Sequence, residues 1–236
     1  MVDVLIDLAR GPLLRASLLV MGLGLLRVAV LQAAELGFAW RRAGDRVVPW
    51  TLVLKRGLAW LWPWRAVRDP ERAPYTGASV LFHIGVLLVP LFFLGHTEIW
   101  RQELGLALPS LPVWFADTLT VLTMAALLWL LASRLANPAR RRLSRAQDWW
   151  LPSLLLGCFA AGWLAAHPRF SPVDGRVIYL AHVLLAEFLF VLVPLSKLQH
   201  LVLFWTSPVS TELGWRFPPG TGDRVRATLG KEGQGI

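Results

Sequence analysis

The sequence predicts an all-α membrane protein, a bundle of about five transmembrane helices, from three observations. Hydrophobic residues make up 56% of the 236 residues and charged residues only 17%, a balance too apolar for a soluble domain of this length. Several uncharged runs reach the roughly 20 residues that a helix needs to cross a bilayer. Basic residues concentrate in alternate loops, as the positive-inside rule requires of a multi-pass protein.

Two of the expected spans, Ala73 to Thr97 and Trp149 to Pro168, contain no Asp, Glu, Lys or Arg. The first span in the chain is expected to be retained rather than cleaved as a signal peptide, because Asp3 and Asp7 precede its basic residues. Three spans with isolated charged residues complete the bundle: 5–26, 111–131 and 177–196.

The distribution of basic residues predicts the orientation of the chain. An excess of Lys and Arg marks the cytoplasmic loops, so the N-terminus is expected outside and the C-terminus in the cytoplasm. The expected location is the inner membrane of a bacterium. The net charge of +9 is therefore attributed to topology and to contact with anionic lipids, and nucleic acid is excluded as a partner. The basic side holds 41–72, 134–145 and the tail, and the opposite side holds Arg10, Arg101, Arg169 and Arg176.

The chain is expected to form a membrane domain, residues 1–206, followed by a cytoplasmic tail, residues 207–236. Within the membrane domain, the Trp- and Arg-rich segment 41–72 is expected to lie in the interface as a helix, with its indoles at headgroup depth. Prolines and glycines predict a tail with little helix, either extended against a cytoplasmic partner or disordered.

Four of the five histidines fall in two spans, His83 and His96 in the second and His182 and His200 in the fifth. Ionisable residues inside a membrane are costly and usually face an interior site. A single such histidine could simply bond a backbone carbonyl, but two pairs on two helices favour a shared function.

The expected orientation gives each histidine a depth. The second span rises from the cytoplasmic side and the fifth descends, so His83 and His200 share an inner level and His96 and His182 an outer level. Two imidazoles from facing helices are what a six-coordinate haem iron requires. The spacings of 13 and 18 residues correspond to about 20 and 27 Å of helix rise, which suits two stacked haems.

The angular phase of the histidines agrees with this hypothesis on one helix only. An 18-residue spacing returns to the same helix face, so His182 and His200 agree. A 13-residue spacing leaves His83 and His96 about 140° apart on an ideal helix. A kink or bulge at Pro90 is expected to change this angle and bring His83 and His96 closer to the same helix face.

Three other residues are singled out near these levels. His167 is expected to be interfacial, with contact to a haem propionate or a quinone, or replacement of His96 as a ligand, as alternatives. Glu187 is expected to be protonated, paired or beside a polar cavity, and a proton relay is an alternative. The single Cys158 forms no disulfide within the chain, and without a CxxCH motif any haem is held by coordination and packing alone.

The histidine segments resemble a known family. Leu81 to Gly85 with Gly95-His96, and His182 to Phe190 with Pro194 to His200, are similar to the haem b membrane subunit of respiratory nitrate reductase, the gamma subunit, and to related cytochrome b subunits of sulfate-reducer electron-transfer complexes. The resemblance implies the same pairing, His83 with His200 and His96 with His182. Because the first histidine pair is further apart here and the Trp-rich segment is longer, a relative that serves another complex fits as well as nitrate reduction.

The function expected from these observations is that of a dihaem cytochrome b in a quinone-linked respiratory oxidoreductase complex. Its cofactors are two haems b, with quinone or menaquinone as the exchangeable substrate. Chemistry on the terminal substrate belongs to a partner, an iron–sulfur or multihaem subunit on the cytoplasmic or periplasmic side. No catalytic residue of its own is assigned to the chain. A haem-free membrane anchor for a cytoplasmic enzyme is the alternative, and a small transporter is a third possibility.

Five charged residues are predicted to interact with the haem propionates or with the quinone. Arg27 and Lys197 are placed to neutralise haem propionates, although snorkelling at helix ends explains them equally well. Glu98, Arg101 and Asp117 lie at the outer end of the second and third spans and are the candidate quinone residues, with solvated interfacial charges as the alternative.

Overall fold

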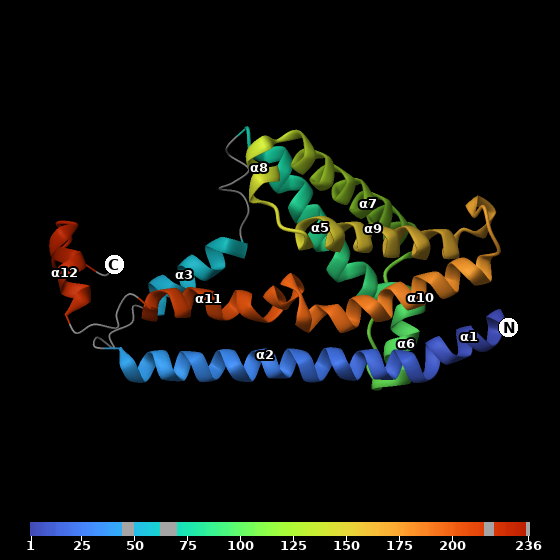
Figure 1. Cartoon of the computed structure of the whole chain (residues 1–236), viewed down its shortest axis with the longest axis horizontal. Helices are drawn as coiled ribbons and strands as arrows, with labels where there is room; N and C mark the ends of the chain where they lie inside the picture. Colours follow the sequence, from blue (N-terminus) through green and yellow to red (C-terminus); the bar gives the residue numbers. More distant parts are fainter. Residues whose placement is uncertain (44–49, 62–69, 215–219, 235–236) are drawn as a thin grey trace. The chain divides into compact units, whose positions relative to one another are not determined.

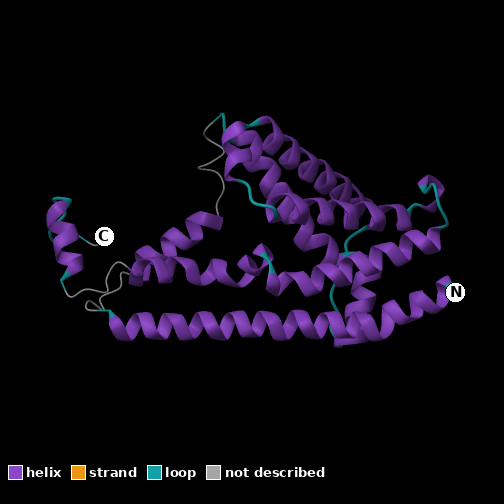
Figure 2. Cartoon of the chain, viewed as in Figure 1, coloured by secondary structure: helices purple, strands orange, loops and turns teal. Residues whose placement is uncertain are grey.

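The computed structural model describes residues 1–43, 50–61, 70–214 and 220–234, and in these ranges the chain is helical with no strand (Figures 1 and 2). Five helices are long and apolar enough to cross a membrane, which confirms the predicted all-α membrane class. The chain is therefore a multi-pass membrane protein. The five spans are Val2–Arg42, Ala73–Phe92, Val113–Ala136, Gln147–Ala166 and Gly175–Leu195.

The first span is longer than its hydrophobic run predicts. Helix α1 (Val2–Leu8) passes through a π-helical turn (Ala9–Leu13) into α2 (Leu14–Arg42). The π-helical turn contains Pro12, whose missing N–H accounts for a local defect in the hydrogen-bond ladder. The predicted end at residue 26 is wrong because the charged residues that follow change the polarity of the helix without breaking it.

The chain divides into two compact units, which are described separately. The first comprises Met1–Leu19 and Trp64–Val191, and the second Val20–Pro63 and Leu192–Ile236. Besides α1, the first unit holds α5 (Ala73–Phe92), α6 (Leu94–Leu104), α7 (Val113–Ala136), α8 (Pro138–Leu143), α9 (Gln147–Ala166), a 3-10 turn (Pro168–Phe170) and α10 (Gly175–Leu192).

The core of the first unit forms where α5, α7 and α9 pack together (Figure 1). Gly85 lets α5 approach α7 so closely that an added Cβ would overlap the Thr123 side chain. Small residues at helix crossings favour such close packing in membranes. Val89, Leu119 and Phe159, one from each helix, form the buried apolar cluster beside it.

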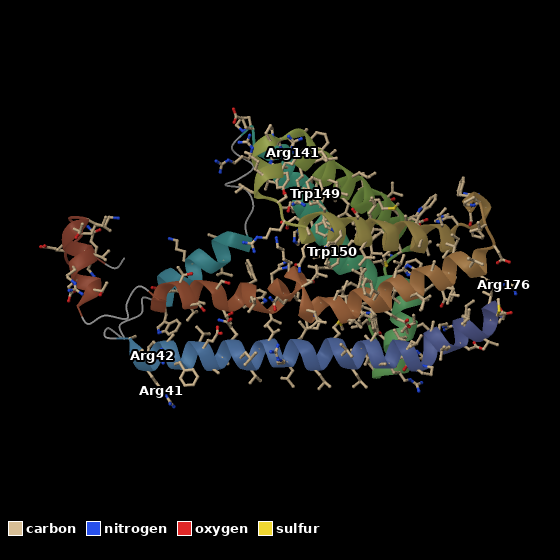
Figure 3. All side chains as sticks on the ribbon, in the orientation of Figure 1. Arg41, Arg42, Arg141, Trp149, Trp150 and Arg176 are labelled. Atoms are coloured by element: carbon tan, nitrogen blue, oxygen red, sulfur yellow. The ribbon has the colours of Figure 1, made fainter. Side chains whose placement is uncertain are left out.

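The two ends of the first unit differ in their side chains. Arg141, Trp149 and Trp150 lie at one end of the α5, α7 and α9 group, and Arg176 lies at the opposite end (Figure 3). The guanidinium of Arg140 also lies over the Tyr75 ring, 4.2 Å from its centroid. Interfacial tryptophans beside a cluster of arginines are typical of a cytoplasmic membrane boundary.

The second predicted span is broken rather than kinked. Helix α5 ends at Phe92, Phe93 is extended, and α6 begins at Leu94. Two carbonyls near the break find new donors: Leu111 N donates to Phe92 O at 2.8 Å and Trp100 Nε1 donates to Pro90 O at 3.1 Å. The single continuous helix expected to carry His83 and His96 is thus wrong, and its phase conflict disappears.

The fifth span agrees with its predicted bounds, but the helix is interrupted at its end, before His200. Helix α10 gives way to two 3-10 turns, Val193–Leu195 and Lys197–Gln199, with Ser196 extended between them, and α11 (His200–Gly214) begins at His200. The Ser196 hydroxyl accepts a bond from Leu198 N at 3.2 Å and caps the new start. The phase agreement predicted for His182 and His200 assumed an unbroken helix and therefore does not apply.

The second unit contains the C-terminal part of α2, α3 (Trp50–Leu61), α11 and α12 (Thr221–Thr228). Buried Val53 of α3 packs against Leu36 and Trp40 of α2 and against Val209 of α11. Gln32 Nε2 donates to Ser210 Oγ at 3.0 Å, which also joins α2 to α11.

The segment 41–72 and the tail are only partly described. Helix α3 confirms a helix in the Trp-rich segment, whereas Arg46, Trp62, Trp64, Arg65 and Arg68 lie outside the described residues. The expectation of a tail with little helix is wrong for 207–214, which belong to α11, and for α12. In α11, the Thr206 and Ser207 hydroxyls both donate to Leu203 O, and the helix continues through Pro208 to Gly214.

Candidate functional site

The outer histidines predicted from the sequence lie together in the first unit. His96 is in the first turn of α6 and His182 is in α10. Their ring centroids are 5.9 Å apart and their planes differ by 18°. The break at Phe93 makes this possible, because it lets α6 turn His96 independently of α5.

Each of the two rings is oriented by a backbone carbonyl. His96 Nδ1 lies 3.3 Å from Val89 O, and His182 Nδ1 lies 3.0 Å from Cys158 O. A carbonyl oxygen only accepts hydrogen bonds, so the Nδ1 of each ring carries the proton and Nε2 keeps its lone pair. This is the tautomer with which a histidine binds a metal through Nε2.

Close packing fixes the position of the His182 ring. A Cβ added at Gly162 of α9 would lie 2.8 Å from His182 Cε1 and 2.9 Å from its Nδ1. Cys158 Sγ is 3.8 Å from the same nitrogen, and the Phe93 ring meets the His96 ring edge-on with centroids 5.3 Å apart. Glycine is therefore the residue that fits at position 162.

The two inner histidines belong to different units, so the geometry of each is given separately. His83 Nδ1 lies 2.7 Å from Ser79 O on α5. His200 Nδ1 lies 2.7 Å from Lys197 O at the start of α11. Both rings therefore also carry their proton on Nδ1.

The two basic residues predicted near propionates lie in the second unit, and both are exposed. A Cβ added at Gly24 of α2 would lie 2.5 Å from the Pro194 ring, so these two segments are in contact. Arg27 and Lys197 each follow the contacting residue by three positions. The structure thus brings the segments that carry them together.

The three candidate quinone residues separate into two sites. Glu98 and Arg101 pair with each other on the exposed face of α6, with Arg101 Nη2 2.6 Å from Glu98 Oε1. The bonds from Arg101 and then Gln102 lower the pKa of Glu98 to about 2. Glu98 is consequently ionised at neutral pH and is a poor proton carrier.

Asp117 instead pairs with His167. Asp117 Oδ2 lies 3.0 Å from His167 Nε2, while His167 Nδ1 lies 2.9 Å from Trp163 O. The Trp163 and His167 rings stack with centroids 4.5 Å apart. The sequence does not predict this pair, although Asp117 lies near the start of one span and His167 directly follows the end of the next.

Glu187 is buried in α10, with 6% of its surface exposed. Within the described part of the chain, its Oε1 has no hydrogen-bond partner. Among the same residues, no three His, Cys, Asp or Glu side chains converge as ligands of a metal ion.

Comparison with curated proteins reveals a relative in Nitratidesulfovibrio vulgaris (strain Hildenborough). It is 37% identical to this chain over 204 residues, which cover 84% of this chain and 87% of the relative. The two proteins belong to one family. The relative is named only "Protein", which states no activity.

No protein-family model matches the chain, and no solved structure matches it. A functional proposal for this family therefore rests on the histidine geometry described above and on the sequence resemblance.

Proposed function

We propose that the protein is a dihaem cytochrome b subunit of a membrane-bound respiratory oxidoreductase complex that transfers electrons between the quinone pool and partner redox subunits. The arrangement of His96 and His182 is the observation that carries this proposal. Both rings have their Nδ1 bonded to a carbonyl, and their centroids are 5.9 Å apart.

This separation would let both histidines bind one iron. A bond from imidazole nitrogen to metal is about 2 Å, as in zinc sites, and the ring centre lies about 1 Å beyond the nitrogen. Two ligands on opposite sides of a metal therefore have ring centres about 6 Å apart, close to the observed value. A histidine pair held by two carbonyls and a glycine would thus be able to hold a haem iron.

Haem bound here would supply one-electron redox chemistry. His96 and His182 would hold the iron, and the carbonyls of Val89 and Cys158 would keep their Nε2 atoms available. Gly162 leaves the space that the His182 ring occupies. The apolar helices around the pair would exclude water and so influence the reduction potential.

The assignment of a second haem rests on the sequence resemblance. His83 and His200 are its proposed ligands, with the proton on Nδ1 in both rings. Arg27 and Lys197 are proposed to compensate propionate charge near His200, in agreement with the contact between Gly24 and Pro194.

The proposal includes an orientation and a location. In this proposal, the protein lies in the inner membrane of a bacterium. The end of the first unit that carries Arg141, Trp149 and Trp150 faces the cytoplasm. The N-terminus is then outside and the C-terminus inside. Quinone or menaquinone exchanges electrons near the outer pair, and iron–sulfur or multihaem partner subunits complete the complex.

Haem content tests this function. The purified full-length chain is expected to bind two haems b, measured as the pyridine haemochrome and as a reduced α band. His182→Ala and His83→Ala should each lower the content from two haems to one, with loss of different redox components in a potentiometric titration. A wild-type chain without haem would overturn the proposal and favour the haem-free anchor.

A further inference from the structure

We propose that His167 and Asp117 form a proton-exchanging site for a quinone bound at the outer end of the first unit. The inference rests on the proposed function and deepens it, because it names the side chains that exchange the proton. The sequence offers Asp117 as a quinone candidate and His167 as an alternative quinone contact, and the structure joins the two.

The proton count of this pair follows from its hydrogen bonds. Trp163 O accepts, so His167 carries one proton on Nδ1. His167 Nε2 then faces a carboxylate oxygen at 3.0 Å, and two acceptors at that distance need a proton between them. The pair therefore holds one exchangeable proton, either on the imidazole or on the carboxyl group.

The pair is reachable from outside the bundle. The side chains of His167 and Asp117 are 20% and 32% exposed, so one edge is open while the rest is packed. Trp163 stacks on both His167 and Phe170, with ring centroids 4.5 and 5.6 Å apart. Flat aromatic rings beside a hydrogen-bonding pair suit an apolar ring that carries two oxygens, which is the chemistry of a quinone head group.

The pair also lies near the outer histidines. Gly162 of α9 touches the His182 ring, and His167 follows it by five residues, or about 7.5 Å of helix rise. A quinone at His167 would therefore be close to the proposed outer haem. Glu98 is a weaker candidate for the proton-exchanging group. It is bonded to Arg101 and Gln102, which lower its pKa to about 2.

The reaction balances with this pair as one proton partner. Conversion of quinone to quinol takes up two electrons and two protons. The electrons arrive one at a time through the chain's own redox path. One proton passes from the pair to a quinone oxygen, the other comes from water at the exposed edge, and water then reprotonates the pair. Oxidation of quinol runs the same steps in reverse.

The experiment compares variants in the intact complex in native membranes. His167→Gln and Asp117→Asn keep hydrogen-bonding groups but remove the exchangeable proton. Asp174→Asn is the matched control, because Asp174 is an exposed carboxylate at the same end that pairs with Arg176. Glu98→Gln tests the competing site.

Two readouts are measured, with haem content as a check on folding. A fluorescent hydroxyquinoline N-oxide probes binding of a quinol analogue, and stopped-flow reduction by menadiol probes electron entry. His167→Gln and Asp117→Asn should weaken analogue binding about tenfold, the effect of replacing a hydrogen bond to a charged group with a neutral one. They should slow haem reduction about 10²-fold, the typical contribution of a general acid or base. Asp174→Asn and Glu98→Gln should match the wild type.

The outcomes separate this inference from the proposed function. Unchanged analogue binding in both His167→Gln and Asp117→Asn would overturn the inference alone, and so would loss of binding in Glu98→Gln. A shifted haem potential with unchanged analogue affinity would assign the pair to a haem propionate and overturn it too. Wild-type haem that menadiol does not reduce would overturn the proposed quinone function itself.

Discussion

The two helix breaks of this protein are alike in sequence and different in setting. Each follows a proline by a few residues: α5 ends two residues after Pro90, and the second helical interruption comes at Ser196, two residues after Pro194. Each is followed by a histidine within the first turn of the next helix. At the first break the chain stays within one compact unit, whereas the second lies beside the boundary between the two units.

The two breaks also differ in how they satisfy the backbone. At the first, Trp100 and Leu111, which lie well after the break, supply the donors for Pro90 O and Phe92 O. At the second, Ser196 caps the chain locally through Leu198 N. Each proline break thus places a histidine at the start of a new helix, but long-range donors stabilise the first break and a local cap stabilises the second.

The largest effect is expected where the first unit holds its histidine pair. Gly162→Leu should displace the His182 ring and remove the proposed outer haem, so that the content falls from the two haems proposed to one. Gly157→Leu on the same helix is the control, because no atom lies within 4 Å of a Cβ added there. Retention of both haems in Gly162→Leu, measured by haemochrome and redox titration, would contradict the packing described at His182.

A smaller effect is expected at the second break. The methyl group added by Gly24→Ala should collide with the Pro194 ring and force α2 away from it. Such overpacking should destabilise the protein by about 1–3 kcal/mol. Gly22→Ala provides the control on α2, since no atom lies within 4 Å of its added Cβ. The thermal midpoint in detergent measures both variants, and equal midpoints would show that α2 does not need this close approach.

The smallest effect is expected from a single hydrogen bond at the first break. Trp100→Phe keeps an aromatic ring but removes the Nε1 donor to Pro90 O, at a cost of about 1 kcal/mol. The denaturant midpoint should fall, and the redox potential of the proposed outer haem should shift because His96 lies one turn away. A shift confined to the inner haem would argue against the proposed pairing.

The sequence predicted the class and the approximate positions of all five spans, because long apolar runs have few alternatives in a membrane. It also identified Pro90 as the place where the second span departs from an ideal helix. It could not locate the break at Phe93, because that depends on donors from Trp100 and Leu111, which only tertiary packing brings near.

The dependence on tertiary packing also determines which site residues could be paired from the sequence. The sequence predicts His96 and His182 at one depth, and their rings are neighbours in the structure; their shared haem stays a prediction. Asp117 and His167 were each singled out but not joined, because their contact depends on the rotation of α7 and α9 about their own axes. Helix rotation is set by packing, which the hydrophobic pattern of a membrane helix specifies poorly.

Helix α2 has a further consequence for the surrounding lipid. Its 29 residues span about 44 Å at 1.5 Å per residue, while the hydrocarbon core of a typical bilayer is about 30 Å thick. The helix must either tilt or carry Arg41 and Arg42 beyond the acyl chains into the headgroups. Bilayer thickness therefore becomes a variable that acts on this protein, and lipids of different chain length should alter the angle at which α2 meets the membrane.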